Sequence, residues 1–310
     1  MHEQLGLKGK VSVVVGSSKG WGRGVALGLA AEGSSVVVNG TDPQAVTKVV
    51  EEIRSRGGTA TGLAVGVHTA EGAQRLTDFA IAGFGRLDVL INSSGGKTSA
   101  TILEVSEAEL DRAIDVQMKA PFLMTHFAAK AMVEGGRPGR IITLAGGAAV
   151  RGLYGESMHA ATKGAVLAAT WTWAMELERF GITVNAIRGG VRSPGTEPLI
   201  ARIREQLKGR GAPHDMSDRE LGFFEPEDAA PLAVWLASDD ASSVTGQFVG
   251  IDGPKITIWA LAEAAEIVEP GGWNFERLGR IVRPQLEAAT EKSRQSGQVI
   301  AALNYVPDAK

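Results

Sequence analysis

Short runs of β-branched and aliphatic residues recur from residue 11 to residue 251, and longer stretches with helical spacing separate them. The runs are apolar throughout rather than at every second position, which is typical of parallel strands buried on both faces. The alternation therefore predicts an α/β fold, a doubly wound seven-stranded parallel sheet with helices on both sides. The predicted strands are Val11–Val15, Ser35–Val38, Thr61–Val65, Leu87–Ile91, Arg140–Leu144, Thr183–Ile187 and Gln247–Ile251.

Residues 1–253 contain this whole alternation with no linker rich in Pro, Ser or Gly, so we expect a single domain. Within it, 194–224 has no clear periodicity, and loops of that length are usually functional or disordered. We interpret 194–224 as a substrate lid, with a disordered insert as the alternative. Residues 254–310 carry apolar positions in steps of three and four after Phe275, and we expect a C-terminal helical extension that Pro284 kinks or divides.

Charge and composition exclude several classes of function. The 310 residues have a net charge of −3 and no long run of one charge, which argues against nucleic acid as a partner. No apolar stretch is long enough to cross a membrane or form a signal peptide, so we expect no membrane partner and a cytoplasmic location. Cysteine is absent and no HExxH motif or Asp-rich loop occurs, so no metal site is expected. A small-molecule substrate is the remaining expectation.

A glycine-rich loop follows the first predicted strand directly. The segment 16–22 reads GSSKGWG and opens a helix. Glycines at this spacing allow a tight turn, bring backbone N–H groups close to a pyrophosphate, and let the helix pack against its strand. The helix amino terminus adds unsatisfied donors and partial positive charge. We therefore assign nucleotide binding to Gly16, Ser18, Lys19, Gly20, Trp21 and Gly22.

Five motifs together resemble the classical short-chain dehydrogenase/reductase family. They are Gly16, Gly20 and Gly22 in a G-x-x-x-G-x-G pattern, Asn92 in NSSG, Lys163 in HAATK, VNAIRGGVRSP at 184–194, and the segment 225–253. The resemblance spans about residues 6–253. It implies a Rossmann-like domain, a nicotinamide dinucleotide cofactor and usually a tetramer, with Asn92, Gly95, Lys163 and Ser193 also at the cofactor.

The choice of nucleotide rests on the end of the second strand. A carboxylate there would bind the ribose hydroxyls of NAD and repel a 2′-phosphate. Gly40 stands at that place, and Thr41 stands where the family's NADP-type arginine often lies. Lys19 lies inside the phosphate loop, where NADP-dependent members commonly carry a basic residue, so we expect NADP(H) rather than NAD(H).

The family's Asn-Ser-Tyr-Lys catalytic set is only partly present. Lys163 matches, His159 stands in the Tyr position one helical turn earlier, Gly146 in the Ser position and Gln117 in the Asn position. Tyr154, like Glu156, precedes this helix and is a candidate to supply a replacement group. The predicted catalytic residues are therefore His159, Lys163, Tyr154 and Gln117.

An ammonium one turn from an imidazole disfavours the imidazolium, so His159 is expected to be mainly neutral near pH 7 and to act as a base. This favours an oxidoreductase that transfers hydride between NADP(H) and a mostly apolar alcohol or ketone. Two alternatives stay open: a lyase, dehydratase or isomerase of the same fold that uses His159 and Lys163 as acid and base, and a nucleotide sensor without turnover.

The predicted helix 160–180 is apolar on every side, with Val166, Trp171 and Trp173 among its members. Such a helix has to be buried in a core or in a subunit contact. We therefore expect a homo-oligomer, a dimer or a tetramer.

Overall fold

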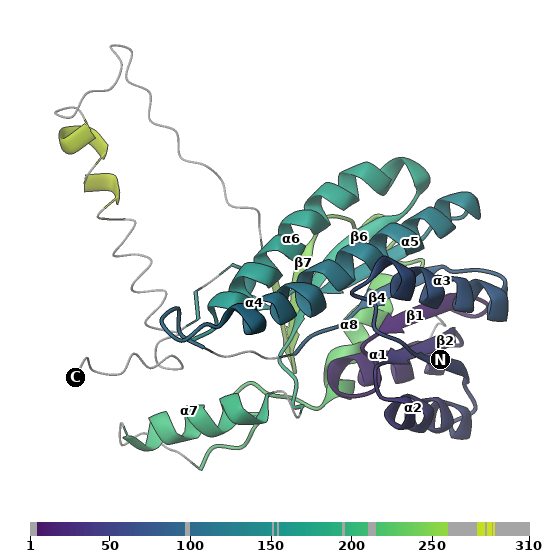
Figure 1. Ribbon diagram of the computed structural model, residues 1–310, viewed down its shortest axis with the longest axis horizontal. Coiled ribbons are helices and arrows are strands. Elements are labelled where there is room, and N and C mark those ends of the chain that lie inside the picture. Colours follow the sequence, from purple (N-terminus) through teal and green to yellow (C-terminus); the bar gives the residue numbers. More distant parts are fainter. Residues whose placement is uncertain are drawn as a thin grey trace.

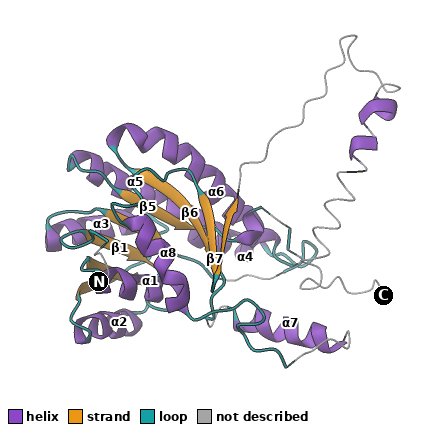
Figure 2. Ribbon diagram, turned by 180° about the vertical axis from the view of Figure 1, so that it is seen from behind, coloured by secondary structure: helices purple, strands orange, loops and turns teal. Residues whose placement is uncertain are grey.

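The structure is a computed structural model, and it describes residues 5–96, 100–150, 152–153, 155–193, 196–209, 215–259, 278–282, 284–286 and 288. One eight-stranded sheet runs through it in the order β3-β2-β1-β4-β5-β6-β7-β8 (Figures 1 and 2). The strands are β1 Val11–Val15, β2 Ser35–Gly40, β3 Thr59–Ala64, β4 Val89–Asn92, β5 Arg140–Leu144, β6 Thr183–Gly189, β7 Phe248–Asp252 and β8 Lys255–Trp259. The α/β doubly wound prediction is confirmed.

Helices cover both faces of the sheet (Figure 1). The α-helices of the described residues are α1 Gly20–Ala31, α2 Pro43–Ser55, α3 Ala70–Phe84, α4 Glu107–Ile114, α5 Ala120–Glu134, α6 Ser157–Leu177, α7 Glu197–Gly209 and α8 Pro226–Ala237. Short 3-10 turns occupy Gly147–Ala149 and Glu178–Phe180, and π turns occupy Asp115–Lys119 and Leu278–Val282. No helix of the described residues is long and apolar enough to span a membrane.

Successive residues of each central strand enter opposite hydrophobic cores. Val14 packs with α1, α2 and α8 on one face, whereas Val13 and Val15 pack with α3, α5 and α6 on the other. This explains why the strands are apolar at every position, because both sides of the pleat are covered.

The prediction of a seven-stranded, wholly parallel sheet is wrong at one edge. Residues 255–259, which we had placed in a helical extension, form β8 and pair antiparallel with β7. Gly253 takes a positive φ of 57° in the two-residue turn, as the favoured turns of antiparallel hairpins require. Trp259 then stacks on Phe248 with ring centroids 4.3 Å apart. Beyond Trp259, the predicted helical extension is described only in part, with helical turns at 278–282 and 284–286. The other positions of that prediction lie outside the described residues.

Segment 194–224 is not the aperiodic stretch that its glycines and Pro213 indicated. It contains α7, whose Ile200 and Ile203 pack with Leu221 in a small hydrophobic cluster of their own. Arg204 donates to Asp218 at 2.7 Å and so ties α7 to the returning chain. In both views α7 stands apart from the two helical layers (Figures 1 and 2).

The helical region 107–134 is not one regular helix, because a turn at 115–119 separates α4 from α5. Pro121 has no backbone N–H to donate to the carbonyl of residue 117, so the regular α-helical ladder fails there. The chain instead makes a π turn over Asp115–Lys119, in which the amide of Ala120 donates to the carbonyl of Asp115. Single π turns of this kind are frequent at functional sites. Gln117 lies at the centre of this one.

Candidate active site

The glycines of the phosphate loop are required by close backbone packing. Gly16 and Gly20 have φ values of 69° and 56°, which favour glycine. A Cβ on Gly22 would lie 2.3 Å from Ser93 Oγ and 2.6 Å from the carbonyl oxygen of Gly16. The loop can therefore approach a ligand with backbone alone.

The amino terminus of α1 is capped differently from those of its neighbours. Asp42, Thr69 and Ser106 cap α2, α3 and α4 with their side chains. Lys19 at the cap of α1 makes no such hydrogen bond, and its side chain is exposed. The first N–H groups of α1 are thus left to a ligand, as the anion sites at helix amino termini require.

Other predicted cofactor residues come to the same edge from neighbouring strands. A Cβ on Gly20 would lie 3.2 Å from Ser193 Cβ, which places the segment after β6 beside the phosphate loop. Asn92, at the end of β4, donates from Nδ2 to Thr125 at 3.1 Å. Among the described residues its buried Oδ1 has no hydrogen-bond partner. Gly95 follows and is exposed.

Trp21 has a structural contact. It is 4% exposed, and its Nε1 lies 3.0 Å from the position of a Cβ on Gly189. It therefore packs α1 against the end of β6.

The end of β2 is crowded rather than acidic. A Cβ on Gly40 would lie 2.7 Å from Ser18 Oγ, so a larger side chain at residue 40 would displace Ser18. The next acid, Asp42, accepts from the amides of Gln44 and Ala45 and begins α2. Three features fit a dinucleotide: the close-packed glycine loop at 16–22, the amino terminus of α1 without a side-chain cap, and a glycine rather than an acid at residue 40.

His159 and Lys163 lie one turn apart on α6, as predicted, but they have different partners. His159 Nδ1 lies 2.7 Å from Gln117 Oε1. Lys163 is 3% exposed, and its Nζ donates to the carbonyl oxygen of Leu144 at 2.7 Å. Burial lowers the pKa of Lys163 to about 8, because the charged form loses hydration.

Gly146 lies opposite the imidazole. A Cβ there would lie 3.7 Å from His159 Nε2, so this nitrogen faces the place where the family carries its serine. Gly146 also has a φ of 117° and a ψ of 156°, a conformation that is essentially restricted to glycine. This conformation could not be predicted from the sequence, because Gly146 and Gly147 are both glycines and the residue type alone does not determine φ.

Tyr154 lies outside the described residues, so its predicted role stays a prediction. Glu156 is 2% exposed and begins α6, and its neighbourhood includes Ala100, with which it forms an isolated parallel bridge. The loop before α4 is thereby held beside the start of α6.

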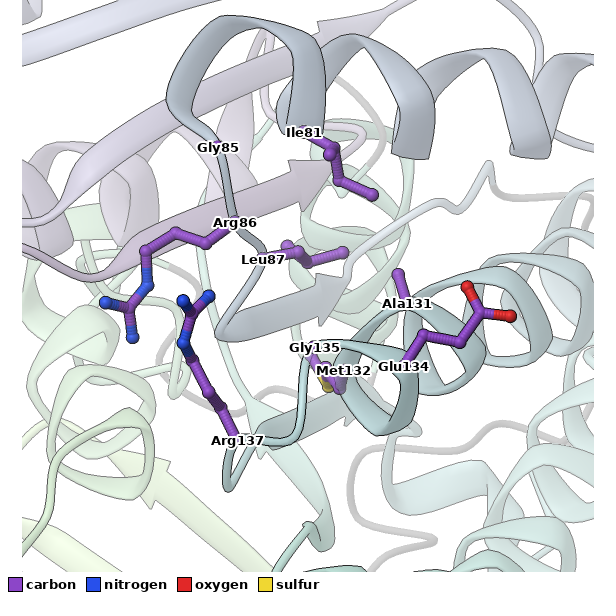
Figure 3. A pocket seen from close by; sticks show the side chains of 9 residues that line it. All are labelled: Ile81, Gly85, Arg86, Leu87, Ala131, Met132, Glu134, Gly135 and Arg137. Carbon is purple, nitrogen blue, oxygen red and sulfur yellow. The ribbon is translucent and has the colours of Figure 1, made fainter.

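A separate pocket of about 200 Å³ lies at the other end of the strands, where the chain enters β4 and β5. It is formed where α3 and α5 end and the chain enters β4, and Figure 3 shows the side chains of Arg86 and Arg137 extending toward the same side of it. Arg86 is paired with Asp88, at 2.5 Å. None of the predicted site residues lies there.

Comparison with known proteins identifies the family. A family model described as enoyl-(acyl carrier protein) reductase matches residues 15–253. The chain belongs to the short-chain dehydrogenase/reductase family. It is an oxidoreductase of that type, and the family prediction is confirmed.

Among relatives of this short-chain dehydrogenase/reductase, the 3-oxoacyl-[acyl-carrier-protein] reductase FabG of Thermotoga maritima is 31% identical over 80% of the chain and 98% of the relative. A probable tetrahydroxynaphthalene reductase of Zymoseptoria tritici is 32% identical over 80% of the chain and 94% of the relative. The crystal structure of a short chain dehydrogenase from Mycobacterium avium superimposes with a TM-score of 0.77 at 30% identity, covering 91% of this chain and 95% of that one.

Within the described residues no group of three His, Cys, Asp or Glu side chains could hold a metal ion.

Proposed function

We propose that the protein transfers hydride between NADP(H) and a mostly apolar alcohol or ketone, with His159 as the proton acceptor. The observation that carries this proposal is the orientation of the imidazole. Its Nδ1 is held by Gln117 at 2.7 Å, and its Nε2 faces the backbone of Gly146.

His159 takes the alcohol proton at Nε2 as the hydride leaves the carbinol carbon. When bound, the nicotinamide accepts that hydride, or supplies it in the reverse direction. Lys163, one turn along α6, carries a pKa of about 8 and is mostly protonated at pH 7. Its ammonium disfavours the imidazolium and so favours oxidation of the alcohol.

Lys163 is also the residue that would hold the ribose hydroxyls of the nicotinamide half. The glycine loop, the first N–H groups of α1 and Ser193 would hold the phosphates, and Asn92 and Gly95 line the same edge. We assign these residues to the nucleotide because they lie together at the carboxyl ends of the strands, where doubly wound sheets bind their ligands.

The preference for NADP(H) rests on charge at the adenosine end. Lys19 is an exposed cation at the start of α1, and Gly40 leaves the end of β2 without a carboxylate. An acid there would repel a 2′-phosphate, and its absence removes that penalty.

Exposed side chains near the start of α6 support the proposed substrate class. Ile102 and Leu103 are 74% and 94% exposed in the loop that Ala100 joins to Glu156, and Val150 is also exposed. An apolar rim of this kind suits a substrate with a hydrophobic body. Two relatives are named for a 3-oxoacyl group and for tetrahydroxynaphthalene, and each of these has a hydrocarbon chain or ring.

The test is absorbance at the reduced-nicotinamide band when the protein is mixed with a panel of secondary alcohols and either NADP or NAD. We expect reduction of the nucleotide with apolar alcohols and a higher kcat/KM with NADP. Binding of both nucleotides, seen as quenching of tryptophan fluorescence, without turnover of any panel alcohol or of the matching ketones would contradict the proposal.

A further inference from the structure

We infer that Gln117 is a positioning residue that fixes His159 as the Nδ1–H tautomer, so that Nε2 is the nitrogen that exchanges the proton. The tautomer is argued from contacts alone. Only the effect on turnover rests on the proposed function.

Gln117 reaches α6 because of the π turn. It is 1% exposed, although its neighbours Asp115 and Lys119 in the same turn pair with each other at the surface, 3.2 Å apart. The wider turn that Pro121 imposes places the amide of Gln117 between the segment after β4 and α6.

The orientation of the Gln117 amide follows from its first partner. Its Nε2 lies 2.5 Å from the carbonyl oxygen of Gly96, which can only accept a hydrogen bond. The amide nitrogen must therefore face Gly96, and Oε1 must face α6. The alternative orientation would set two oxygens against each other.

The protonation of His159 follows from the second contact. Oε1 can only accept, so His159 Nδ1, 2.7 Å away, has to carry the hydrogen. In the neutral ring the lone pair then resides on Nε2, the nitrogen that faces Gly146.

This arrangement differs from one with a carboxylate behind the imidazole. An amide oxygen holds the N–H in place but takes no proton and carries no full charge. It orients the ring, as the third group behind a catalytic base does, without stabilising the imidazolium strongly. His159 therefore stays a base, and the proton it takes at Nε2 has to leave from Nε2.

The charged groups around His159 are few in the described part of the chain. Lys163 lies one turn along α6 with Nζ on Leu144, and Glu156 begins the helix. On the π turn, Asp115 and Lys119 pair with one another. On α4, the acids Glu107, Glu109 and Asp111 and the base Arg112 are exposed.

The experiment is two-dimensional ¹H–¹⁵N NMR of the histidine rings in the full-length protein at a pH where His159 is neutral. The assignment comes from the His159→Asn spectrum. We expect a pyrrole-type Nδ1 and a pyridine-type Nε2. A pyridine-type Nδ1 in the wild-type protein would overturn the inference whatever the enzyme's activity.

Gln117→Leu removes the hydrogen bonds to Gly96 and His159, together with a longer one from Thr162 at 3.3 Å, at nearly constant volume. We expect a mixture of ring tautomers and a kcat about 10- to 100-fold lower with a KM changed less than about threefold, because the base is present but misoriented. Gln74→Leu, an exposed change on α3, is the matched control and should alter neither measurement. Retention of the single Nδ1–H form in Gln117→Leu would contradict the inference.

Gln117→Glu provides a second variant if the leucine protein does not fold. The carboxylate still accepts from Nδ1, adds a charge, and loses the donor to the carbonyl oxygen of Gly96. We expect the Nδ1–H form to persist and the pKa of His159 to rise, with the acid limb of the kcat profile moving to higher pH. An unchanged His159 titration in this variant would show that Gln117 is not the partner of the ring.

Discussion

At the scale of single residues, the site is set by two backbone constraints that the side chains then exploit. Gly146 has a φ of 117°, so the position where the family carries serine has no low-strain conformation for a side chain. Pro121 removes one helical hydrogen bond and thereby allows Gln117 to reach His159.

Gly146→Ser tests the backbone constraint. We expect a loss of about 1–3 kcal/mol in the free energy of unfolding, because serine has to adopt a conformation that only glycine takes without strain. Chemical denaturation measures it. Gly83→Ser, on α3 at a glycine without positive φ and with no atom within 4 Å of the added Cβ, should change stability by less than about 0.5 kcal/mol. Equal stabilities for the two variants would contradict this account of Gly146.

Lys163 predicts a pH-dependent stability with a definite sign. Its pKa is about 8 in the folded protein and near 10.5 when unfolded, so the unfolded chain binds the proton more tightly. The cost of burying the charge is fully present below pH 8 and disappears as the pH rises from 8 to 10.5. Lys163→Met should therefore stabilise the protein by on the order of 2 kcal/mol at pH 7, after loss of the bond to Leu144.

The measurement is urea unfolding of the wild-type protein and Lys163→Met between pH 7 and pH 10.5. The advantage of the variant should shrink across that range. Lys130→Met, whose side chain is exposed on α5, should show no such trend. A gain that stays constant with pH would mean that folding does not lower the pKa of Lys163.

At the scale of elements, the strands with continuous apolar runs could be predicted from the sequence. The elements β8 and α7 could not, because glycines and prolines near them obscured the apolar pattern. Val11–Val15 and Arg140–Leu144 were predicted at their exact bounds, because strands buried on both faces leave a continuous apolar run. β8 was missed because Gly253 and Pro254 look like the end of a domain rather than a turn between paired strands. α7 was missed because the surrounding glycines and Pro213 outweighed the steps from Ile200 to Ile203 and Leu207.

The pairing of β8 with β7 is stabilised by one aromatic contact. Trp259→Ala removes the ring that stacks on Phe248 at 4.3 Å, and we expect a loss of about 2 kcal/mol in the free energy of unfolding. Ile258→Ala, on the same strand but 71% exposed, should cost less than about 0.5 kcal/mol. If thermal or chemical unfolding gave both variants the same stability, the edge strand would not be held by this stack.

At the scale of the whole molecule, the motifs predicted the family and placed the expected nucleotide site at the carboxyl ends of the strands. Both predictions depend on local glycines and on the order of the strands. The sequence also identified His159 and Gln117 as candidate site residues. It did not predict the contact between them, because that contact depends on a π turn and on the packing of α6 against it. The apolar character of α6 also predicts a contact between subunits. Met175 on this helix is 72% exposed, and Phe122 on the adjoining α5 is 40% exposed.

We expect these exposed residues to lie in a homo-oligomer contact, because large apolar side chains exposed on neighbouring helices mark interaction surfaces. Sedimentation velocity of the wild-type protein should give a dimer or a tetramer, and Met175→Glu should shift it toward the monomer. The exposed control Glu176→Gln should leave the assembly unchanged. A monomeric wild-type protein would contradict the prediction.

The central claim is that His159 is the proton acceptor in hydride transfer. The most direct measurement is kcat for the best panel alcohol in His159→Ala, together with the Kd of NADP from tryptophan quenching. We predict a kcat at least about 100-fold lower, with the Kd of NADP changed less than about threefold, because general base catalysis is lost while the nucleotide cradle is intact. Full turnover by His159→Ala would contradict the claim.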